Sequence, residues 1–416
     1  MSLASRVGLP KAPARQAVTC PYCFAVAPAH RIPFRCRGQA GRRAGCAPVL
    51  DERLAAYTGS AAGASLPPVF AAPGRGGRAD CPACGQPTGS RVCGECHNPL
   101  PSAYCEAPGR IVALVGAKNA GKSTYIAVLL HELMNRVGTE LDASLVACDD
   151  RTIERYKRDF ARPLLEERRL LPTTASAATS PREPLVYLLT RTRRGRFARE
   201  RTDSLALVLF DTAGEDLRSR ELRDLHLRYL EAADSIIFLV DPLELPGAGA
   251  ALTAAPPPDS DAEPDSEPVN IIARVTEALR ARHGTRPGER LEVPVAVALT
   301  KIDVLAPELA RQSALHRSRS GSGVLDLDDR DAVHEQVRSL LHDWQAGRLE
   351  TYLGQQYADF ALFGLSALGG VPENGRVGAG GVRPHRAEDP LLWLLYRFGM
   401  LDGTRGAAEG ARGRGA

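Results

Sequence analysis

The sequence predicts an α/β fold, a mostly parallel sheet with helices on both faces, preceded by one or two small cysteine-rich modules. Three observations predict it. Several short apolar runs, each typical of a buried parallel strand, end directly in polar loop residues. The intervals between these runs are long enough for the crossover helices that parallel strands require. Nine of the ten cysteines lie within residues 20–105, before the first of these runs.

The cysteines are spaced as metal ligands. Cys81, Cys84, Cys93 and Cys96 form C-x₂-C-x₈-C-x₂-C, in which two knuckles can close one tetrahedral Zn²⁺ site, and this predicts a zinc ribbon over residues 80–103. A less regular group predicts another ribbon over residues 1–55, with the ligands Cys20, Cys23, Cys36 and Cys46. Residues 56–79, rich in Ala, Gly, Pro and Ser, form the predicted linker. Interleaving of the two groups in one module stays open as an alternative.

Zinc is preferred to disulfides because residues 1–19 lack the apolar core of a signal peptide. No stretch approaches 18 uninterrupted apolar residues, so no membrane insertion is expected, and the expected location is the cytoplasm. The net charge is +4, with the positive excess in the first 110 residues. Nucleic acid is a weaker candidate than a protein partner, because few aromatic side chains accompany the arginine cluster Arg31, Arg35, Arg37, Arg42 and Arg43.

The first apolar run, residues 110–115, leads into a glycine-rich loop and then a helix with one apolar side. The loop fits G-x-x-x-x-G-K-[ST], which cradles phosphates with backbone amides at a helix N-terminus. Lys122 would reach the β- and γ-phosphates, and Ser123 would bind Mg²⁺. Only five of 53 basic residues are lysines, and Lys122 is one of them. The predicted phosphate-binding residues are Gly116, Ala117, Lys118, Asn119, Ala120, Gly121, Lys122, Ser123 and Thr124.

Three later runs end in further candidate residues. Residues 204–210 lead to Asp211 and Gly214, which would hold Mg²⁺ and the γ-phosphate. Residues 293–299 lead to Thr300, Lys301 and Asp303. The Asp303 carboxylate can accept two hydrogen bonds from guanine, which adenine cannot donate, and the Lys301 stem would cover the base. Residues 360–365 lead to Ser366, Ala367 and Leu368, where a backbone amide would meet the guanine O6.

In this order, the four segments resemble the Ras-like and Era-like GTPases of the TRAFAC class. The resemblance covers about residues 108–400, and the predicted GTPase domain spans residues 104–402. It implies GTP and GDP as ligands, Mg²⁺, and a molecular switch. Thr300 departs from the commoner asparagine, which weakens loop bracing more than guanine choice. By analogy a threonine closes over Mg²⁺, and Thr173 is the preferred candidate, with Thr174 beside it. A charged helix, residues 149–171, precedes them.

Glu215 follows Gly214 where many Ras-like GTPases have glutamine, so slow hydrolysis or completion by a partner is expected. Asn119 resembles the asparagine that holds K⁺ in Era-like GTPases, although it can equally cap the loop turn. Zinc ribbons before such a domain resemble the bacterial double-GTPase families, which implies a second GTPase as partner in a conflict or signalling system. The alternatives are an adaptor with negligible hydrolysis and an RNA-associated or ribosome-associated GTPase. Residues 245–268 and 403–416 are predicted to be disordered.

Overall fold

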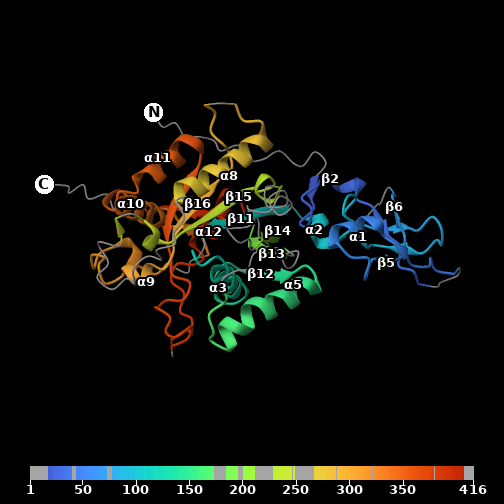
Figure 1. The fold of residues 1–416 in the computed structure, drawn as a ribbon, viewed down its shortest axis with the longest axis horizontal. Coiled ribbons are helices and arrows are strands. Elements are labelled where there is room, and N and C mark those ends of the chain that lie inside the picture. Colours follow the sequence, from blue (N-terminus) through green and yellow to red (C-terminus); the bar gives the residue numbers. More distant parts are fainter. Residues whose placement is uncertain are drawn as a thin grey trace. The chain divides into compact units, whose positions relative to one another are not determined.

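The computed structural model describes residues 17–39, 44–72, 77–107, 109–117, 119–172, 184–194, 200–210, 228–245, 247–248, 267–286, 288–319, 323–378 and 380–406. The chain divides into two compact units, an N-terminal unit Met1–Gly109 and a C-terminal unit Arg110–Ala416 (Figure 1). The predicted α/β class is confirmed. The division falls just after α2 (Ser102–Glu106), so this short helix belongs to the cysteine-rich unit rather than to the domain predicted to start at residue 104.

The N-terminal unit consists of short antiparallel strands around one longer helix. A four-stranded sheet has the order β10-β9-β3-β6, and three two-stranded ribbons pair β1 with β2, β4 with β5 and β7 with β8. Helix α1 begins because the Asp51 side chain accepts the Leu54 amide, and it ends at Gly59 in the left-handed conformation. The strands are Ala17–Thr19 (β1), Val26–Pro28 (β2), Phe34–Arg35 (β3), Val49–Leu50 (β4), Ser65–Leu66 (β5), Val69–Phe70 (β6), Ala79–Asp80 (β7), Pro87–Thr88 (β8), Arg91–Val92 (β9) and Pro99–Leu100 (β10), and the helices are Ala29–Arg31 (η1) and Glu52–Thr58 (α1).

The segment predicted as a linker is part of this unit. The described part of residues 56–79 contains the end of α1 and the strands β5 and β6. Strand β6 pairs with β3, with Phe34 opposite Phe70, and the two rings stack with centroids 6.2 Å apart. The prediction followed the Ala, Gly, Pro and Ser content, whereas two apolar residues, Val69 and Phe70, were enough to add a strand to the sheet.

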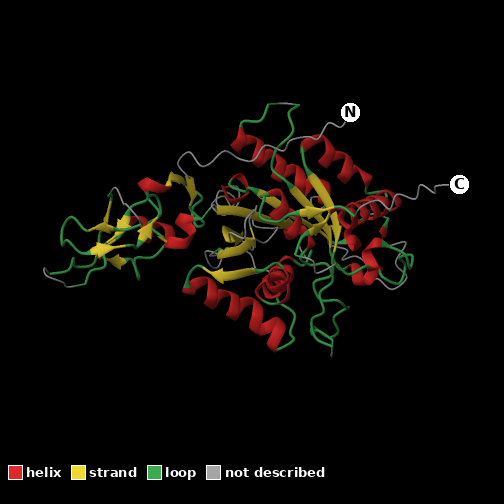
Figure 2. Ribbon diagram, turned by 180° about the vertical axis from the view of Figure 1, so that it is seen from behind, coloured by secondary structure: helices red, strands yellow, loops and turns green. Residues whose placement is uncertain are grey.

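A seven-stranded sheet organises the C-terminal unit, in the order β12-β13-β14-β11-β15-β16-β18 (Figure 2). Strands β11, β15, β16 and β18 run parallel, and β13 pairs antiparallel with both of its neighbours, β12 and β14. The strands are Gly109–Gly116 (β11), Ala143–Ala147 (β12), Leu185–Arg194 (β13), Glu200–Phe210 (β14), Ser235–Val240 (β15), Val295–Leu299 (β16) and Phe360–Gly364 (β18). The predicted parallel strands are almost continuously apolar because both faces of the sheet are covered.

Helices lie on both faces of this sheet (Figures 1 and 2). A large apolar core joins α3, η2 and α12 to one face, and α8 and α11 lie on the other side in Figure 1. The helices are Lys122–Met134 (α3), Arg136–Glu140 (α4), Asp150–Arg155 (α5), Tyr156–Glu166 (η2), Pro242–Glu244 (η5), Pro268–His283 (α8), Ile302–Leu305 (α9), Ala314–His316 (η7), Leu327–Asp343 (α10), Gly347–Gln356 (α11) and Asp389–Arg397 (α12).

The insert between the first helix and the candidate switch threonines combines a helix and an edge strand. Strand β12 pairs with β13 at the edge of the sheet, where Val146 is 59% exposed. Helix α5 then continues into η2, which has π-helical geometry and contains Pro163. Cys148 follows β12 and is half-buried rather than a fully buried core residue, and burial raises its pKa to about 12.

The two predicted disordered segments lie mostly outside the described residues, which include 245, 247–248 and 267–268 of the acidic insertion. At the C-terminus, residues 403–406 are ordered. Strand β19 (Gly403–Thr404) pairs with β17 (Leu325–Asp326), and the Gly406 amide donates to Asp328 at 2.8 Å. The domain therefore continues a few residues past 402, because these backbone bonds fix the chain although its composition is glycine-rich.

Candidate functional site

The candidate site lies at one edge of the sheet, where four parallel strands end. In register, Gly116 lies opposite Leu239, Val240 opposite Leu299, and Leu299 opposite Gly364. The loops after β11, β15, β16 and β18 therefore start side by side. The carboxyl edge of such a sheet is where α/β proteins bind ligands. One of these loops, after β11, was predicted to bind phosphate, and two, after β16 and β18, were predicted to contact the guanine base; the fold brings the three together.

The glycine-rich loop after β11 has the backbone that its sequence predicts. Asn119 and Gly121 both have positive φ, 66° and 82°. Gly121 leads directly into α3, whose first amides have no carbonyl partners in the preceding turn. A Cβ at Gly116 would lie 2.6 Å from the Leu239 carbonyl oxygen, so this glycine is required by the neighbouring strand β15 rather than by a phosphate. Lys118 lies outside the described residues.

Lys122 is held over its own loop. Its side chain is buried, and Nζ donates to the Gly116 carbonyl at 2.9 Å and to the Ala117 carbonyl at 2.6 Å. A lysine ammonium is a compact point charge that donates three hydrogen bonds. These contacts hold the ammonium against the backbone at the start of the glycine-rich loop. Ser123 and Thr124 follow in the first turn of α3, both half-buried.

The loop after β16 is braced from two sides. The Thr300 amide and hydroxyl both donate to the Val240 carbonyl, at 2.8 and 3.3 Å, and the Ile302 amide donates to the Leu365 carbonyl at 3.2 Å. The threonine that departs from the family's asparagine therefore still ties this loop to the adjacent strand. Lys301 has a left-handed backbone, with φ 53°, which turns the chain into α9.

Two groups predicted to read guanine stay available. The Asp303 carboxylate is half-buried in the first turn of α9 and bonds to none of the described residues. After β18, the Ser366 amide donates to His385 and the Gly369 amide donates to the Ser366 hydroxyl, at 2.9 and 2.8 Å. The Ala367 and Leu368 amides between them have no partner among the described residues. The Asp303 carboxylate can therefore accept hydrogen bonds from the guanine N–H groups, and a backbone amide after β18 can donate one to O6.

Sequence reasoning missed Asp241. This residue ends β15 and is 4% exposed. Its Oδ2 accepts Lys301 Nζ at 2.5 Å, and its Oδ1 accepts the Leu243 amide at 3.0 Å. The ion pair therefore fixes the distal end of the side chain predicted to cover the base. The available signal was an acidic residue directly after an apolar run, the same signal that selected Asp211.

Several predicted residues lie outside the described part of the chain. They are the candidate switch threonines and the residues after β14, namely Thr173, Thr174, Asp211, Gly214 and Glu215. The flanking elements are described, because β14 ends at Phe210 and residues 167–172 lead toward Thr173. Their roles in binding Mg²⁺ and the γ-phosphate remain predictions.

In the N-terminal unit, all eight predicted zinc ligands gather in two four-cysteine clusters. Within each cluster the sulfur atoms lie within 4.8 Å of one another. The shortest contacts between knuckles are 3.6 Å from Cys23 to Cys93 and 3.5 Å from Cys36 to Cys84. Four thiolates at about 2.3 Å from one Zn²⁺ would have sulfur atoms about 3.8 Å apart, so both clusters fit this ion.

The grouping of the ligands differs from the sequential one predicted. Cys20 and Cys23 meet Cys93 and Cys96, and a separate cluster contains Cys36, Cys46, Cys81 and Cys84. The two predicted ribbons are therefore replaced by one interleaved module. The local C-x₂-C knuckles were correct, but their partners are set by strand pairing. Strand β3, just before Cys36, pairs with β9, just before Cys93, so residues of both clusters extend from the same sheet.

The chemistry of each cluster also favours a cation. Burial raises the pKa of the Cys20 thiol, whereas hydrogen bonds from Cys20 and Cys23 lower the pKa of Cys93. Backbone amides of Tyr22 and Glu95 donate to the sulfurs of Cys20 and Cys93, each at 3.4 Å. Amide donors to sulfur stabilise thiolates. One divalent cation would balance the charge that four neighbouring thiolates accumulate.

Asp51 connects the two clusters. It accepts Arg35 at 2.6 Å and His97 Nδ1 at 2.8 Å. Arg35 precedes Cys36, and His97 follows Cys96, so the carboxylate joins a residue beside each cluster. Burial alone would raise the pKa of Asp51, but the Arg35 guanidinium and the Leu54 amide hold it below its ordinary value. Arg35 is 9% exposed, which removes it from the arginine cluster considered for nucleic acid, and Arg42 and Arg43 lie outside the described residues.

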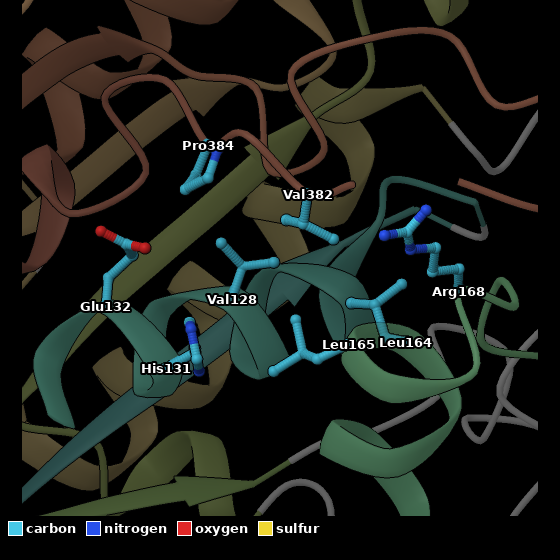
Figure 3. Close-up of a pocket in the computed structure, with 8 residues that line it drawn as sticks. All are labelled: Val128, His131, Glu132, Leu164, Leu165, Arg168, Val382 and Pro384. Carbon is cyan, nitrogen blue, oxygen red and sulfur yellow. The ribbon is translucent and has the colours of Figure 1, made fainter. Parts of the chain in front are cut away.

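A cavity of about 230 Å³ lies on the outer side of α3, away from the phosphate-loop end of this helix. Figure 3 shows Val128 in its floor, with Leu164 and Leu165 of η2 on one side and Val382 and Pro384 on the other. The helix that begins the phosphate site, the insert and the loop after Ser366 therefore meet here. None of the described helices is both long and apolar enough to cross a membrane.

The sequence matches a known protein family and a curated relative. The family model named Double-GTPase 2 matches residues 110–344. SaeC of Mycolicibacterium smegmatis, a proposed ESX-1 scaffolding and assembly protein, is 30% identical over 331 residues, covering 74% of this chain and 80% of that protein.

Two solved structures to which this chain is similar are GTPase domains. The small GTPase Arl6 (BBS3) from Trypanosoma brucei, bound to the nucleotide analogue GppNp, has 16% identity and a TM-score of 0.26, covering 70% of this chain and 96% of that chain. The G domain of the T. maritima FeoB iron transporter has 11% identity and a TM-score of 0.23, covering 63% and 90%. The fold assignment depends on the strand order and on the family match, since these structural scores are low.

Proposed function

Because this chain belongs to the Double-GTPase 2 family, we propose that it is a Mg²⁺-dependent GTP-binding switch that hydrolyses GTP slowly by itself. The observation that carries the proposal is the convergence of the phosphate loop and the base loops at one sheet edge. Lys122 is the phosphate ligand, and Asp303 and the Ala367 amide are the guanine-reading groups. The scaffold supplies positions and fixed charges, which is what phosphoryl transfer requires of a protein.

Magnesium has a place in this proposal through the chain's own hydroxyl and carboxylate groups. Ser123, in the first turn of α3, is the described candidate ligand, and Thr173 and Asp211 are the predicted ones. Oxygen ligands of this kind suit Mg²⁺, which would offset the negative charge of the phosphates when bound. Glu215 can accept a hydrogen bond from water but adds negative charge beside the phosphates, which favours slow turnover until a partner completes the site.

The direct test is the loss of the phosphate ligand. In the Lys122→Ala variant, we expect GTP to bind roughly 100-fold more weakly, because hydrogen bonds to charged groups contribute about 1.5–3 kcal/mol each. Lys157→Ala is the matched control, since this lysine is exposed on η2. Fluorescence titration with mant-GTP measures binding, and single-turnover hydrolysis measures activity. A wild-type protein that fails to bind mant-GTP would disprove the proposal.

Potassium is a further candidate ligand of the same site. Asn119 is exposed, has φ 66° and bonds to none of the described residues, so capping of the loop turn has no support from these contacts. We expect faster hydrolysis in KCl than in NaCl at equal ionic strength, because a monovalent cation offsets charge that develops between the β- and γ-phosphates. Asn119→Ala should remove the difference. Equal rates in both salts, measured with the physiological partner present, would refute the role of K⁺.

The relative's description supports a second candidate function, assembly of a protein complex. SaeC is a proposed scaffolding and assembly protein, and this chain adds an interleaved cysteine module to a nucleotide-binding domain. In that function, two zinc ions rigidify a docking module, GTP is bound with negligible hydrolysis, and the partner is a bacterial protein such as a second GTPase. Zinc thiolates and GTP both suit the cytoplasm. Single-turnover hydrolysis with and without cell extract distinguishes an assembly scaffold from a hydrolysing switch.

The RNA-associated alternative has less support. Its predicted surface included Arg35, which pairs with Asp51 in the interior of the module. Salt-dependent RNA binding that is lost on charge reversal of Arg37, Arg42 and Arg43 would revive it.

A further inference from the structure

The segment after the guanine-reading loop is built as a connection between two sites. We call residues 366–385 the bridging loop. Its base is an antiparallel pair, in which Ser366 and His385 exchange backbone hydrogen bonds at 2.9 and 2.8 Å, and the Arg383 amide donates to the Leu368 carbonyl at 2.9 Å. The two arms approach so closely that a Cβ at Gly369 would lie 1.8 Å from the Arg383 carbonyl oxygen. This base is therefore rigid and specific in sequence.

The base of the bridging loop sets the position of the Ala367 amide. Ser366 and Gly369, on either side, both use their amides within the loop, so Ala367 projects from a short fixed turn. His385 is in turn fixed from outside the loop, because its Nε2 lies 2.7 Å from the Leu315 carbonyl oxygen. The arms of the bridging loop are therefore bonded directly to the turn that contains Ala367, one of the three residues predicted to offer a backbone amide to guanine O6.

The tip of the bridging loop is attached to the insert instead. Asn374 and Gly375 both have positive φ and form the turn. Beyond the turn, the Val377 amide donates to the Arg168 carbonyl and the Leu170 amide donates to the Gly375 carbonyl, each at 2.9 Å. Val377 is buried in the same apolar core as α3. The tip is thus anchored by backbone bonds and by a buried side chain, to a segment that ends three residues before Thr173.

The arm of the bridging loop that leads from its tip back to His385 passes over α3. Val382 and Pro384 face Val128 across the cavity on this helix, as Figure 3 shows. Helix α3 begins with Lys122, the phosphate ligand. One loop therefore touches the base-reading turn, the phosphate-loop helix and the approach to the candidate switch threonine.

We propose that the bridging loop couples the two ends of the nucleotide site, so that the conformation of residues 167–172 controls how tightly guanine nucleotide is held. The proposal rests on the proposed function. When the segment before Thr173 moves, it pulls on Gly375 and Val377, and the loop arms shift the Ala367 amide. By reciprocity, a nucleotide bound beside the Ala367 amide alters the order of residues 168–170.

The test deletes the tip of the bridging loop and keeps the paired arms that carry Ala367. In the full chain, residues 370–381 are replaced by Asn-Gly, which forms a two-residue turn between paired arms. We expect mant-GDP to dissociate about fivefold to tenfold faster, the lower end of typical coupling between sites. Val377→Ala, which keeps the backbone and removes the buried anchor, should act in the same direction. Val371→Ala is the matched control, because Val371 lies on the same loop and is 63% exposed.

A second measurement reports coupling without mutation. Amide hydrogen exchange at Leu170 and Val377 should differ between the GDP-bound and the GTPγS-bound wild-type protein. If exchange is the same in both states and both variants release mant-GDP at the wild-type rate, the coupling is disproved while the proposed function stands. If wild-type protein binds neither nucleotide, the proposed function itself fails, and the coupling with it.

Discussion

Asp303→Asn is expected to change the base preference of the protein from guanine to xanthine. The carboxylate is half-buried at the start of α9 and bonds to none of the described residues, so it is free to accept the N1–H and N2–H₂ groups of guanine. An asparagine amide loses one acceptor and gains a donor, which suits the C2 carbonyl of xanthine. We expect GTP affinity to fall roughly 100-fold, since hydrogen bonds to a charged group contribute about 1.5–3 kcal/mol each, and XTP affinity to rise.

Competition against mant-GDP by GTP, XTP and ATP measures this change. Glu308→Gln is the control, because this carboxylate is exposed just beyond α9 and should leave all three affinities unchanged. For the wild-type protein, GTP should compete far better than ATP. Equal competition by ATP and GTP would contradict guanine selection by Asp303, whatever the variant does.

Loss of a single zinc ligand is expected to remove one metal ion and unfold much of the N-terminal unit. The free energy of binding a structural Zn²⁺ is about 10–16 kcal/mol and stabilises only the folded module. We therefore expect about two zinc ions per wild-type chain and about one in Cys93→Ser, measured by elemental analysis of reduced protein. Cys105→Ser, a buried cysteine outside both clusters, should keep both ions.

Double variants test the interleaved pairing. Cys23 and Cys93 share a cluster, with sulfur atoms 3.6 Å apart, so Cys23→Ser combined with Cys93→Ser should lose no more zinc than either single variant. Cys93→Ser combined with Cys84→Ser should lose both ions. The sequential grouping predicts the opposite result for the two pairs. Protein without zinc after purification under reducing conditions would exclude both arrangements.

The nucleotide site illustrates what sequence motifs can predict. Residues 116–124 and 300–303 are continuous segments whose chemistry and backbone requirements are local. Gly121 has the positive φ that such a loop needs, and Lys122 donates to the Gly116 carbonyl of the same loop, while its contact with phosphate stays a prediction. Asp241 carried the local signal of an acidic residue directly after an apolar run, but its partner Lys301 lies 60 residues away and only the structure identifies that pair. Thr173 and Asp211 stay predictions, since they lie outside the described residues.

By itself, the sequence determined the elements whose cause is local: the apolar runs that became parallel strands, the phosphate loop, and the C-x₂-C knuckles. Only the tertiary structure decided which knuckles share a metal, that residues 65–70 add strands to the module, and that the loop after Ser366 reaches the insert. The physical reason is that a motif's backbone geometry is set by adjacent residues. Pairing between distant segments depends instead on strand register and buried contacts, and closing a longer loop changes its entropic cost only slightly, so sequence distance does not reveal the partner.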